Sequence, residues 1–198
     1  MILTEDTSPL PSALPLAAFK EHLRLGRGFG ETALQETILE SFLRAAIAAI
    51  EARTGKVLLQ RRFAWTLTHW RHPSRQVLPA APVSSIVSMT LVDRAGGTTP
   101  VPAGAYALQK DLHSPTLCAG GASLPPIPRH GQAVLVFVAG FGATWGDVPI
   151  DLQQAVMLLA AHYYEYREDT ALKSGCVPFG VSVLIERYRP LRLHMGEA

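Results

Sequence analysis

The stretch from Ile150 to Glu168 constrains the fold most, because it predicts a long helix with almost no polar face. Pro149 is favoured near a helix start, where its missing N–H costs nothing. Apolar residues recur at helical spacing along the stretch, at Leu152, Ala155, Val156, Leu159, Tyr163 and Tyr166. Met157, Leu158 and Ala161 occupy most of the remaining surface. A helix of this composition has to be buried on nearly all sides.

Other segments also have helical periodicity. A short amphipathic helix is expected over residues 16–25, and a longer one over residues 32–54, where Gly55 supplies the stop. A last short helix precedes Pro190 and carries its apolar side chains on one side, at Val181, Leu184, Ile185 and Tyr188.

Between the long helices the apolar period changes to two, which is typical of a strand with one buried face. Phe63, Trp65 and Leu67 alternate with polar or small residues. Prolines and glycines favour a long irregular loop over residues 112–131. Further strands are expected over residues 85–92, 106–110 and 133–139.

The expected fold class is therefore α+β, a helical bundle (N-terminal helices, long central helix, C-terminal helices) with a β-rich insertion between the long helices. The length of 198 residues favours a single domain. Its expected parts are N-terminal helices at 16–55, the β-rich insertion at 56–140, C-terminal helices at 149–190, and a tail at 191–198 with no obvious core to join.

Composition limits the classes of function. Hydrophobic residues make up 48% of the chain and charged residues 17%, which indicates a globular protein whose surface is partly covered by partners. A formal net charge of +2 is too small for a chain that coats nucleic acid. Two cysteines, Cys118 and Cys176, cannot form a disulfide framework or a four-ligand zinc site. Without a signal peptide or a membrane-spanning run, a soluble protein of a reducing compartment is expected.

Several residues invite a catalytic or metal-binding interpretation. His162 and Glu165 lie three residues apart on the long helix, like one half of a two-helix metal site. In that motif, however, the glutamate precedes the histidine, and the sequence contains no second copy of the pair. Cys176 lacks an orienting third group for nucleophilic catalysis. His69 and His72 have no matching cysteine or carboxylate pair. We therefore expect no catalytic residue, no metal site and no cofactor, and hence no enzyme.

Two further motifs suggest phosphate or nucleic-acid binding. Residues 26–30 place three glycines before a helix, but no strand precedes them and no Gly-Lys-Ser/Thr follows, so a hinge is favoured. The densest basic stretch contains Arg61, Arg62, Arg71, His72 and Arg75. Aromatic residues lie between these basic residues in the sequence. Phe63, Trp65 and Trp70 could stack on bases, but because these aromatics alternate inward on a strand, we expect them in the core.

The order of motifs along almost the whole chain resembles the head-tail connector, or adaptor, proteins of long-tailed phages and phage-derived gene transfer agents. The resemblance rests on residues 19–25, on the alanine-rich helix that ends at residues 51–55, and on Val138-Ala139-Gly140-Phe141-Gly142. It continues through Val148-Pro149, Gln154-Ala155-Val156, His162-Tyr163-Tyr164-Glu165, Pro178-Phe179-Gly180-Val181 and Tyr188-Arg189-Pro190. The glycine-rich residues 26–30, in place of an acidic loop, and the proline-rich residues 112–131 depart from the family.

The resemblance implies a structural adaptor in a virion or gene transfer agent particle, made in the bacterial cytoplasm. Copies of the chain would form a twelve-fold ring at the head-tail junction that docks on the portal protein. The ring would connect to a tail-side stopper or tail terminator protein, and DNA would pass through its lumen without sequence recognition. No membrane is involved. The alternatives are a small nucleic-acid-binding module and a metal-dependent hydrolase.

Residues of the second half take roles in this picture. The nearly all-apolar helix suits a subunit packed by copies of itself, and we expect the inter-subunit packing residues to be Met157, Ala161, Tyr164 and Tyr166. The C-terminal tail would insert apolar anchors into a partner groove while its arginines meet acidic rims. Its expected portal-docking residues are Arg187, Arg189, Leu191, Arg192, Leu193, His194 and Met195.

Overall fold

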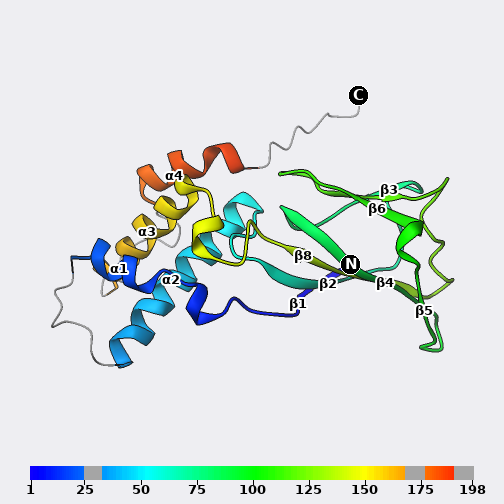
Figure 1. Cartoon of the computed structure of the whole chain (residues 1–198), viewed down its shortest axis with the longest axis horizontal. Coiled ribbons are helices and arrows are strands. Elements are labelled where there is room, and N and C mark those ends of the chain that lie inside the picture. The colour runs from blue at the N-terminus through cyan, green and yellow to red at the C-terminus, as the bar shows by residue number, and fades with distance from the viewer. Residues whose placement is uncertain (25–32, 168–176, 190–198) are drawn as a thin grey trace. The chain divides into compact units, whose positions relative to one another are not determined.

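The computed structural model describes residues 1–24, 33–167 and 177–189, and the chain divides into two compact units (Figure 1). The first, called here the strand unit, comprises Met1–Leu10 and Val57–Thr144. The second, the helical unit, comprises Pro11–Lys56 and Trp145–Ala198. Among the described helices none is long and apolar enough to cross a membrane.

The larger sheet of the strand unit has five antiparallel strands in the order β1-β2-β8-β4-β5. These strands are β1 (Ile2–Glu5), β2 (Arg61–Leu67), β8 (Gln132–Ala139), β4 (Val83–Val92) and β5 (Thr98–Pro100). In β2 and β8 buried and half-buried residues alternate, as the period of two predicts. One face of this sheet therefore carries most of the core of the unit.

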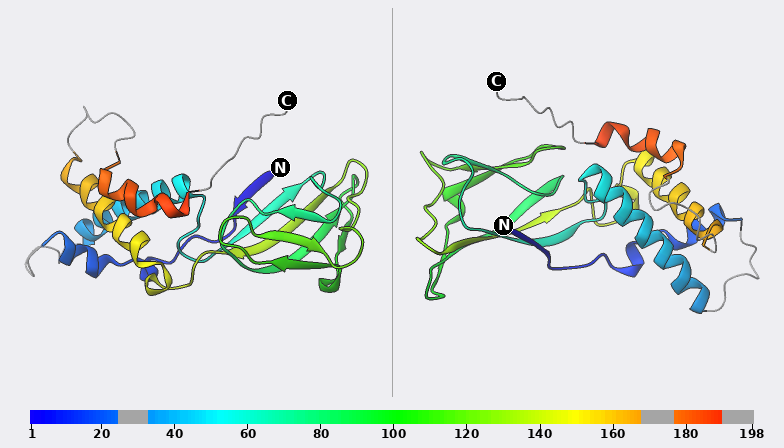
Figure 2. Two further views of the ribbon diagram at one scale, coloured as in Figure 1. Left: turned by 90° about the horizontal axis from the view of Figure 1, so that it is seen from above. Right: turned by 180° about the vertical axis from the view of Figure 1, so that it is seen from behind.

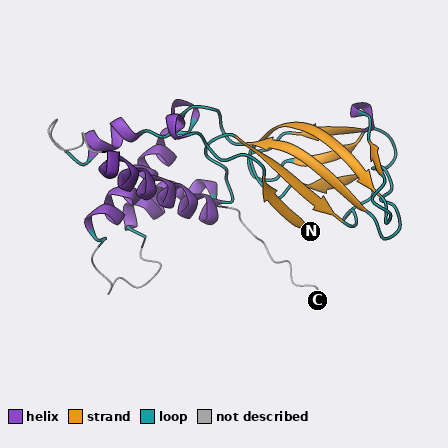
Figure 3. Ribbon diagram, turned by 90° about the horizontal axis from the view of Figure 1, so that it is seen from below, coloured by secondary structure: helices purple, strands orange, loops and turns teal. Residues whose placement is uncertain are grey.

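A smaller antiparallel sheet has the order β3-β7-β6 and covers that core from the other side. Its strands are β3 (Arg75–Val77), β7 (Thr116–Ala119) and β6 (Tyr106–Gln109), and a short 3-10 turn, η2 (Ala103–Ala105), leads into β6. Leu117 of β7 is fully buried in one cluster with Phe63, Leu135 and Phe137 of the larger sheet. All strands, orange in Figure 3, belong to the strand unit.

Gly140 ends β8 at a point where only glycine fits. Its φ of +132° lies in a region that L side chains rarely adopt. A Cβ there would lie 2.5 Å from the Cα and 2.6 Å from the backbone nitrogen of Gln60. The glycine therefore allows the turn after β8 to pass close to the backbone before β2.

Gly140→Ala is expected to lower the free energy of unfolding by about 3 kcal/mol, because it combines backbone strain with a clash against backbone. The matched control is Gly121→Ala, where a Cβ meets nothing within 4 Å, and it should change stability by less than about 0.5 kcal/mol. Urea unfolding followed by circular dichroism measures both, and equal stability of the two variants would contradict the assignment.

The helical unit contains α1 (Leu16–His22), α2 (Ala33–Thr54), α3 (Ile150–Glu165) and α4 (Phe179–Ile185), with short 3-10 turns η1 (Pro11–Ala13), η3 (Trp145–Asp147) and η4 (Glu186–Tyr188). Both α2 and α4 pack against α3 (Figure 2). Phe19 of α1, Leu43 and Ile50 of α2, and Leu159 of α3 are fully buried. Gly55, at φ +65°, follows the last residue of α2.

The expected fold class is wrong. The structure is a mixed fold, rich in strands, with short helices and two antiparallel sheets of five and three strands, and not a helical bundle with a long central helix. The sheets enclose a hydrophobic core of their own, so they are not an appendage of a bundle. This core forms because strands that are distant in the sequence pair with one another. Apolar periodicity describes each segment by itself and does not predict such pairing.

Individual elements match their expected ranges. The helices α2 and α3 begin and end within a few residues of the predicted ends. Strand β2 lies where alternation predicted it, and β4, β6 and β8 lie within a few residues of the strands expected over residues 85–92, 106–110 and 133–139. The segment 112–131, expected to be irregular, contains β7, and β1 was not expected. The glycine-rich residues 26–30 lie outside the described residues.

Candidate interaction surface

Helix α3 buries only one side within the chain. Leu152, Ala155, Val156, Leu159 and Ala160 are buried, whereas Leu158 and Ala161 are half-buried. Ile150 at its start is 78% exposed. A helix with so few polar residues thus keeps apolar surface open to a partner, which is where packing between copies was expected.

The four residues expected to pack between subunits differ in the exposed fraction of their side chains. Met157 is only 8% exposed, so the chain itself covers it. Ala161 and Tyr164 are half-buried, and Tyr166 is 47% exposed. Of the four, Tyr166 has the most surface to offer a neighbouring chain.

Aromatic contacts fix the end of α3. The ring of Tyr164 meets Phe42 of α2 edge-on at 6.0 Å between centroids, and the guanidinium of Arg167 lies 4.8 Å from the Tyr164 centroid. The rings of His162 and Tyr166 are 4.7 Å apart. Tyr164 is thus packed within the chain, whereas Tyr166 contacts His162 and keeps about half of its side chain open to a partner.

Helix α4 exposes two large apolar side chains one turn apart. Phe179 is 84% exposed and Val183 is 58% exposed, while Val181 and Ile185 on the other side are buried. The sequence analysis assigned the buried side of α4 correctly but did not single out Phe179 and Val183. Their spacing of four, offset from the buried pair, is the signal that could have found them.

Asp151 anchors the C-terminal end of the described chain to α3. Its carboxylate accepts a hydrogen bond of 2.7 Å from the hydroxyl of Tyr188 and lies 3.3 Å from a guanidinium nitrogen of Arg187. The Tyr188 side chain is buried, and the Arg187 guanidinium lies 4.9 Å from its ring centroid. Sequence reasoning assigned Tyr188 to a buried face but gave no role to Asp151.

Burial, together with the hydrogen bond to the Asp151 carboxylate and its negative charge, raises the pKa of Tyr188 to about 12. A phenol whose folded pKa exceeds its unfolded value of 10.0 contributes stability that is fully present below pH 10. That contribution disappears as the pH rises through about 10 to 12, and a shift of this size corresponds to roughly 2 to 3 kcal/mol.

Tyr188→Phe is therefore expected to remove this part of the alkaline loss of stability. The wild type should lose more of its free energy of unfolding between pH 9 and about pH 12 than the variant does. Tyr166→Phe, at an exposed tyrosine, is the matched control and should follow the wild type. Denaturant titrations across this pH range measure the difference, and parallel curves for Tyr188→Phe and wild type would refute the anchor.

Only the first two of the expected portal-docking residues belong to the part of the chain that the structure describes. Arg187 and Arg189 are exposed, and Arg189 lies 3.3 Å from Glu186, a surface pair of little energetic weight. Leu191, Arg192, Leu193, His194 and Met195 lie outside the described residues. The described chain therefore ends at Arg189, the residue that follows the anchored Tyr188.

The described residues that were considered for catalysis are not gathered into a site. Over residues 1–24, 33–167 and 177–189 no group of three or more His, Cys, Asp or Glu side chains could hold a metal ion. His162 contacts aromatic rings, and Glu165 is exposed. Cys176 lies outside the described residues.

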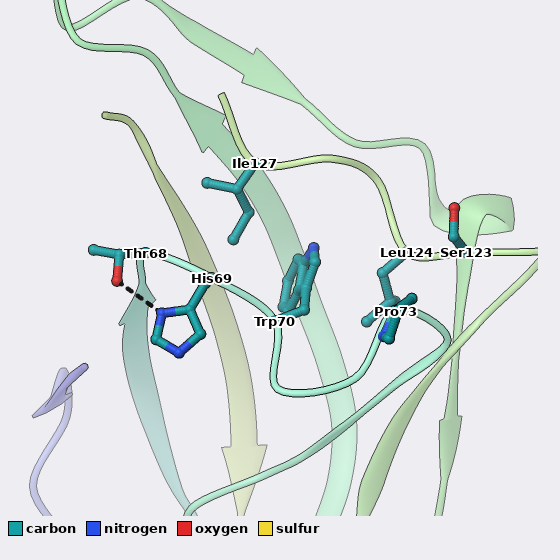
Figure 4. Close-up of a pocket in the computed structure, with 7 residues that line it drawn as sticks. All are labelled: Thr68, His69, Trp70, Pro73, Ser123, Leu124 and Ile127. Atoms are coloured by element: carbon teal, nitrogen blue, oxygen red, sulfur yellow. Dashed lines mark hydrogen bonds between the residues drawn. The ribbon is translucent and has the colours of Figure 1, made fainter. Parts of the chain in front are cut away.

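An open cavity of about 380 Å³ lies beside the basic stretch of the strand unit (Figure 4). The indole of Trp70 forms one wall and donates a 2.8 Å hydrogen bond to the carbonyl of Pro125. His69 lies at the rim, 3.3 Å from the Thr68 hydroxyl. His72 accepts a hydrogen bond from the backbone N–H of Ser74. The two histidines thus make local contacts, and Phe63 and Trp65 are core residues, as expected.

No protein-family model matches the sequence, and no curated protein matches it. Three solved structures are similar over 99% of this chain and 99% of their own. The neck of an empty gene transfer agent (GTA) particle computed with C6 symmetry contains a chain 49% identical, with a TM-score of 0.89. The virion of a native GTA particle contains a chain that is 49% identical, with a TM-score of 0.87. The neck of a native GTA particle computed with C12 symmetry contains a chain that is 47% identical, with a TM-score of 0.85.

These similarities, together with the apolar surface left open on the helical unit, define a structural component of a gene transfer agent particle. The chain belongs to the family of neck proteins of gene transfer agent particles. The expected structural role at the head-tail junction of such a particle is thereby confirmed, whereas the adaptor role and its individual contacts remain predictions.

Proposed function

We propose that the chain is the ring-forming adaptor of the neck. Twelve copies form the ring, the C-terminal tail docks on the portal protein, and the other side meets a stopper or tail terminator protein. DNA passes through the lumen without sequence recognition. The observation that carries the proposal is the similarity, along 99% of the chain, to a chain in a GTA neck computed with C12 symmetry.

Closed rotational symmetry supports the ring, because it requires each copy to present two different surfaces to its neighbours. The helical unit offers apolar side chains for this purpose at Ile150, Tyr166 and Phe179. We assign inter-subunit packing to Met157, Ala161, Tyr164 and Tyr166. Tyr166 contributes most of the buried area, and Met157 contributes least, because the chain itself already covers most of its side chain. The strand and helical units act together as one adaptor domain in this proposal.

The anchored end of the described chain supports docking of the tail. Tyr188 and Arg187 are tied to Asp151, so the tail leaves from a fixed point on the helical unit. Beyond that point leucines alternate with an arginine and a histidine, a composition that gains from an apolar groove with an acidic rim. The docking residues are those named from the sequence: Arg187, Arg189, Leu191, Arg192, Leu193, His194 and Met195.

Cryo-electron microscopy of particles that carry this chain tests the proposal. Density for both units of the chain is expected between the portal and the tail, in twelve copies, as the C12 symmetry of the similar neck suggests. Particles from cells that lack the chain serve as the control and should have full heads without attached tails. Finding the chain elsewhere in the particle, or finding joined tails without it, would refute the adaptor role.

A further inference from the structure

Strand β1 is an open edge of the five-stranded sheet, drawn dark blue in Figure 2. It pairs with β2 through Ile2↔Thr66, Leu3↔Trp65, Thr4↔Ala64 and Glu5↔Phe63. No other strand of the described residues pairs with it. All four of its residues are exposed, so its attachment rests mainly on one row of backbone hydrogen bonds.

The register shows which backbone groups face outward. The N–H of Asp6 donates to the carbonyl of Arg62 at 2.9 Å, so these two residues form a hydrogen-bonded pair. Hydrogen-bonded and non-bonded pairs alternate in an antiparallel ladder. The N–H and C=O groups of Leu3 and Glu5 therefore point away from β2, along the open edge, where they can bond to an added strand.

The two edges of the sheet are protected to different degrees. The opposite edge strand, β5 (Thr98–Pro100), has only three residues and ends in a proline. Short length and proline both protect an edge strand against unwanted pairing. In β1, by contrast, Ile2 is 67% and Leu3 is 40% exposed. Glu5 puts a charge at one end of β1, so the apolar part of this edge is Ile2 and Leu3, and their exposure favours coverage by another chain.

The sheet surface next to β1 is mixed. Its outer face, meaning the side chains opposite the core, includes the apolar residues Ile2, Ala64, Val134, Val136 and Val138. Thr4, Arg62 and Thr66 lie on the same face, and the three valines of β8 are half-buried. An antiparallel sheet usually presents polar residues on a solvated face. The valines of β8 thus add apolar area to a face that polar residues of β1 and β2 interrupt.

Charge favours a polypeptide at this edge over nucleic acid. The cations beside β1 are already paired, since Arg61 lies 3.3 Å from Glu5 and Arg62 lies 4.0 Å from Asp6. Exposed arginines elsewhere in the strand unit, such as Arg94 and Arg129, lie in loops and not along the edge. DNA would find phosphate contacts in those loops and none along β1.

A second copy of this chain is the occupant that fits. Similar chains lie in necks computed with C6 and C12 symmetry, where every copy has a neighbour related by rotation. A contact that closes such a ring joins two different surfaces, and an open edge against another part of the next copy meets that condition. We propose that the β1 edge is an inter-subunit contact of the neck ring, at which the next copy of the chain adds a strand beside Leu3 and Glu5. This inference rests on the proposed ring.

Leu3→Pro in the full chain tests the contact, because it removes the outward N–H while the bonds from Thr4 to β2 remain. Proline is tolerated on an edge strand when its nitrogen faces outward, so the free chain should keep its circular dichroism spectrum. Variant chains replace the wild type in particle-producing cells, and mass spectrometry counts their copies per particle. We expect at least about tenfold fewer copies for Leu3→Pro. The matched control Leu3→Ala keeps the N–H and should lose less than about threefold.

Wild-type copy number for Leu3→Pro, or equal losses for both variants, overturns the added strand. Absence of the wild-type chain from the neck overturns the proposed function and this inference with it. Should Leu3→Pro fail to fold, hydrogen exchange of the wild-type segment 1–6 decides. Exchange at least about tenfold slower in the assembled neck than in the free chain supports the contact, and equal exchange refutes it.

Discussion

Deletion of residues 191–198 is expected to leave both units folded and to abolish binding to isolated portal rings. The deletion removes none of the described contacts, since the last anchored side chain is Tyr188. It does remove three large apolar residues and an arginine, which are the groups we expect to dock. Loss of such anchors typically costs several kcal/mol of binding, at least about a hundredfold in affinity.

Pull-down of the truncated chain on immobilised portal rings measures the effect, with circular dichroism as the check on folding. The matched control keeps the length of the tail and replaces Leu191, Leu193 and Met195 by serine. This control should bind as poorly as the truncation, because the apolar anchors supply most of the docking energy. Unimpaired binding of the truncated chain would show that the portal contact lies elsewhere, for example on Phe179 and Val183.

Phe137→Ala is expected to lower the free energy of unfolding by about 3–5 kcal/mol, because it opens a cavity in the core of the strand unit. The ring of Phe137 is fully buried and stacks on Phe63 with 5.7 Å between centroids. Phe179→Ala makes the same chemical change at an exposed position and should alter stability by less than about 0.5 kcal/mol.

Urea unfolding of the free chain measures both variants. A small effect of Phe137→Ala would mean that the strand unit lacks the shared core described here. A large effect of Phe179→Ala would mean that its ring is covered in the free chain and is not available to a partner. The pair thus separates residues that hold the fold from those left for assembly.

Sequence periodicity located the longer elements well and the short ones poorly. The helices α2 and α3 repeat their apolar spacing over several turns, so the signal accumulates. Strands β1, β3, β5 and β7 have only three or four residues, too few for alternation to stand out. The β7 strand is stabilised by its pairing with the nearby β6 and with β3, which lies far away along the chain, and a proline-rich neighbourhood concealed it.

The candidate surfaces show the same division. Periodicity predicted that α3 would have too little polar surface, and the exposed Ile150 at its start agrees with that. The anchor between Asp151 and Tyr188 joins residues 37 positions apart and has no local sequence signal. The open edge of β1 could not be predicted from the sequence. A strand is an edge when it has a neighbouring strand on one side only, and this depends on how the whole sheet is assembled.

The sequence by itself determined the positions of α2 and α3, the alternation in β2, and the glycine stop at Gly55. These features depend on residues close together along the chain, whose periodicity and backbone preferences act locally. Only the tertiary structure decided that the strands form two sheets around a separate core, that Gly140 passes against Gln60, and that β1 is left at an open edge. These depend on contacts between distant segments, where strand pairing and packing, and not local preference, set the free energy.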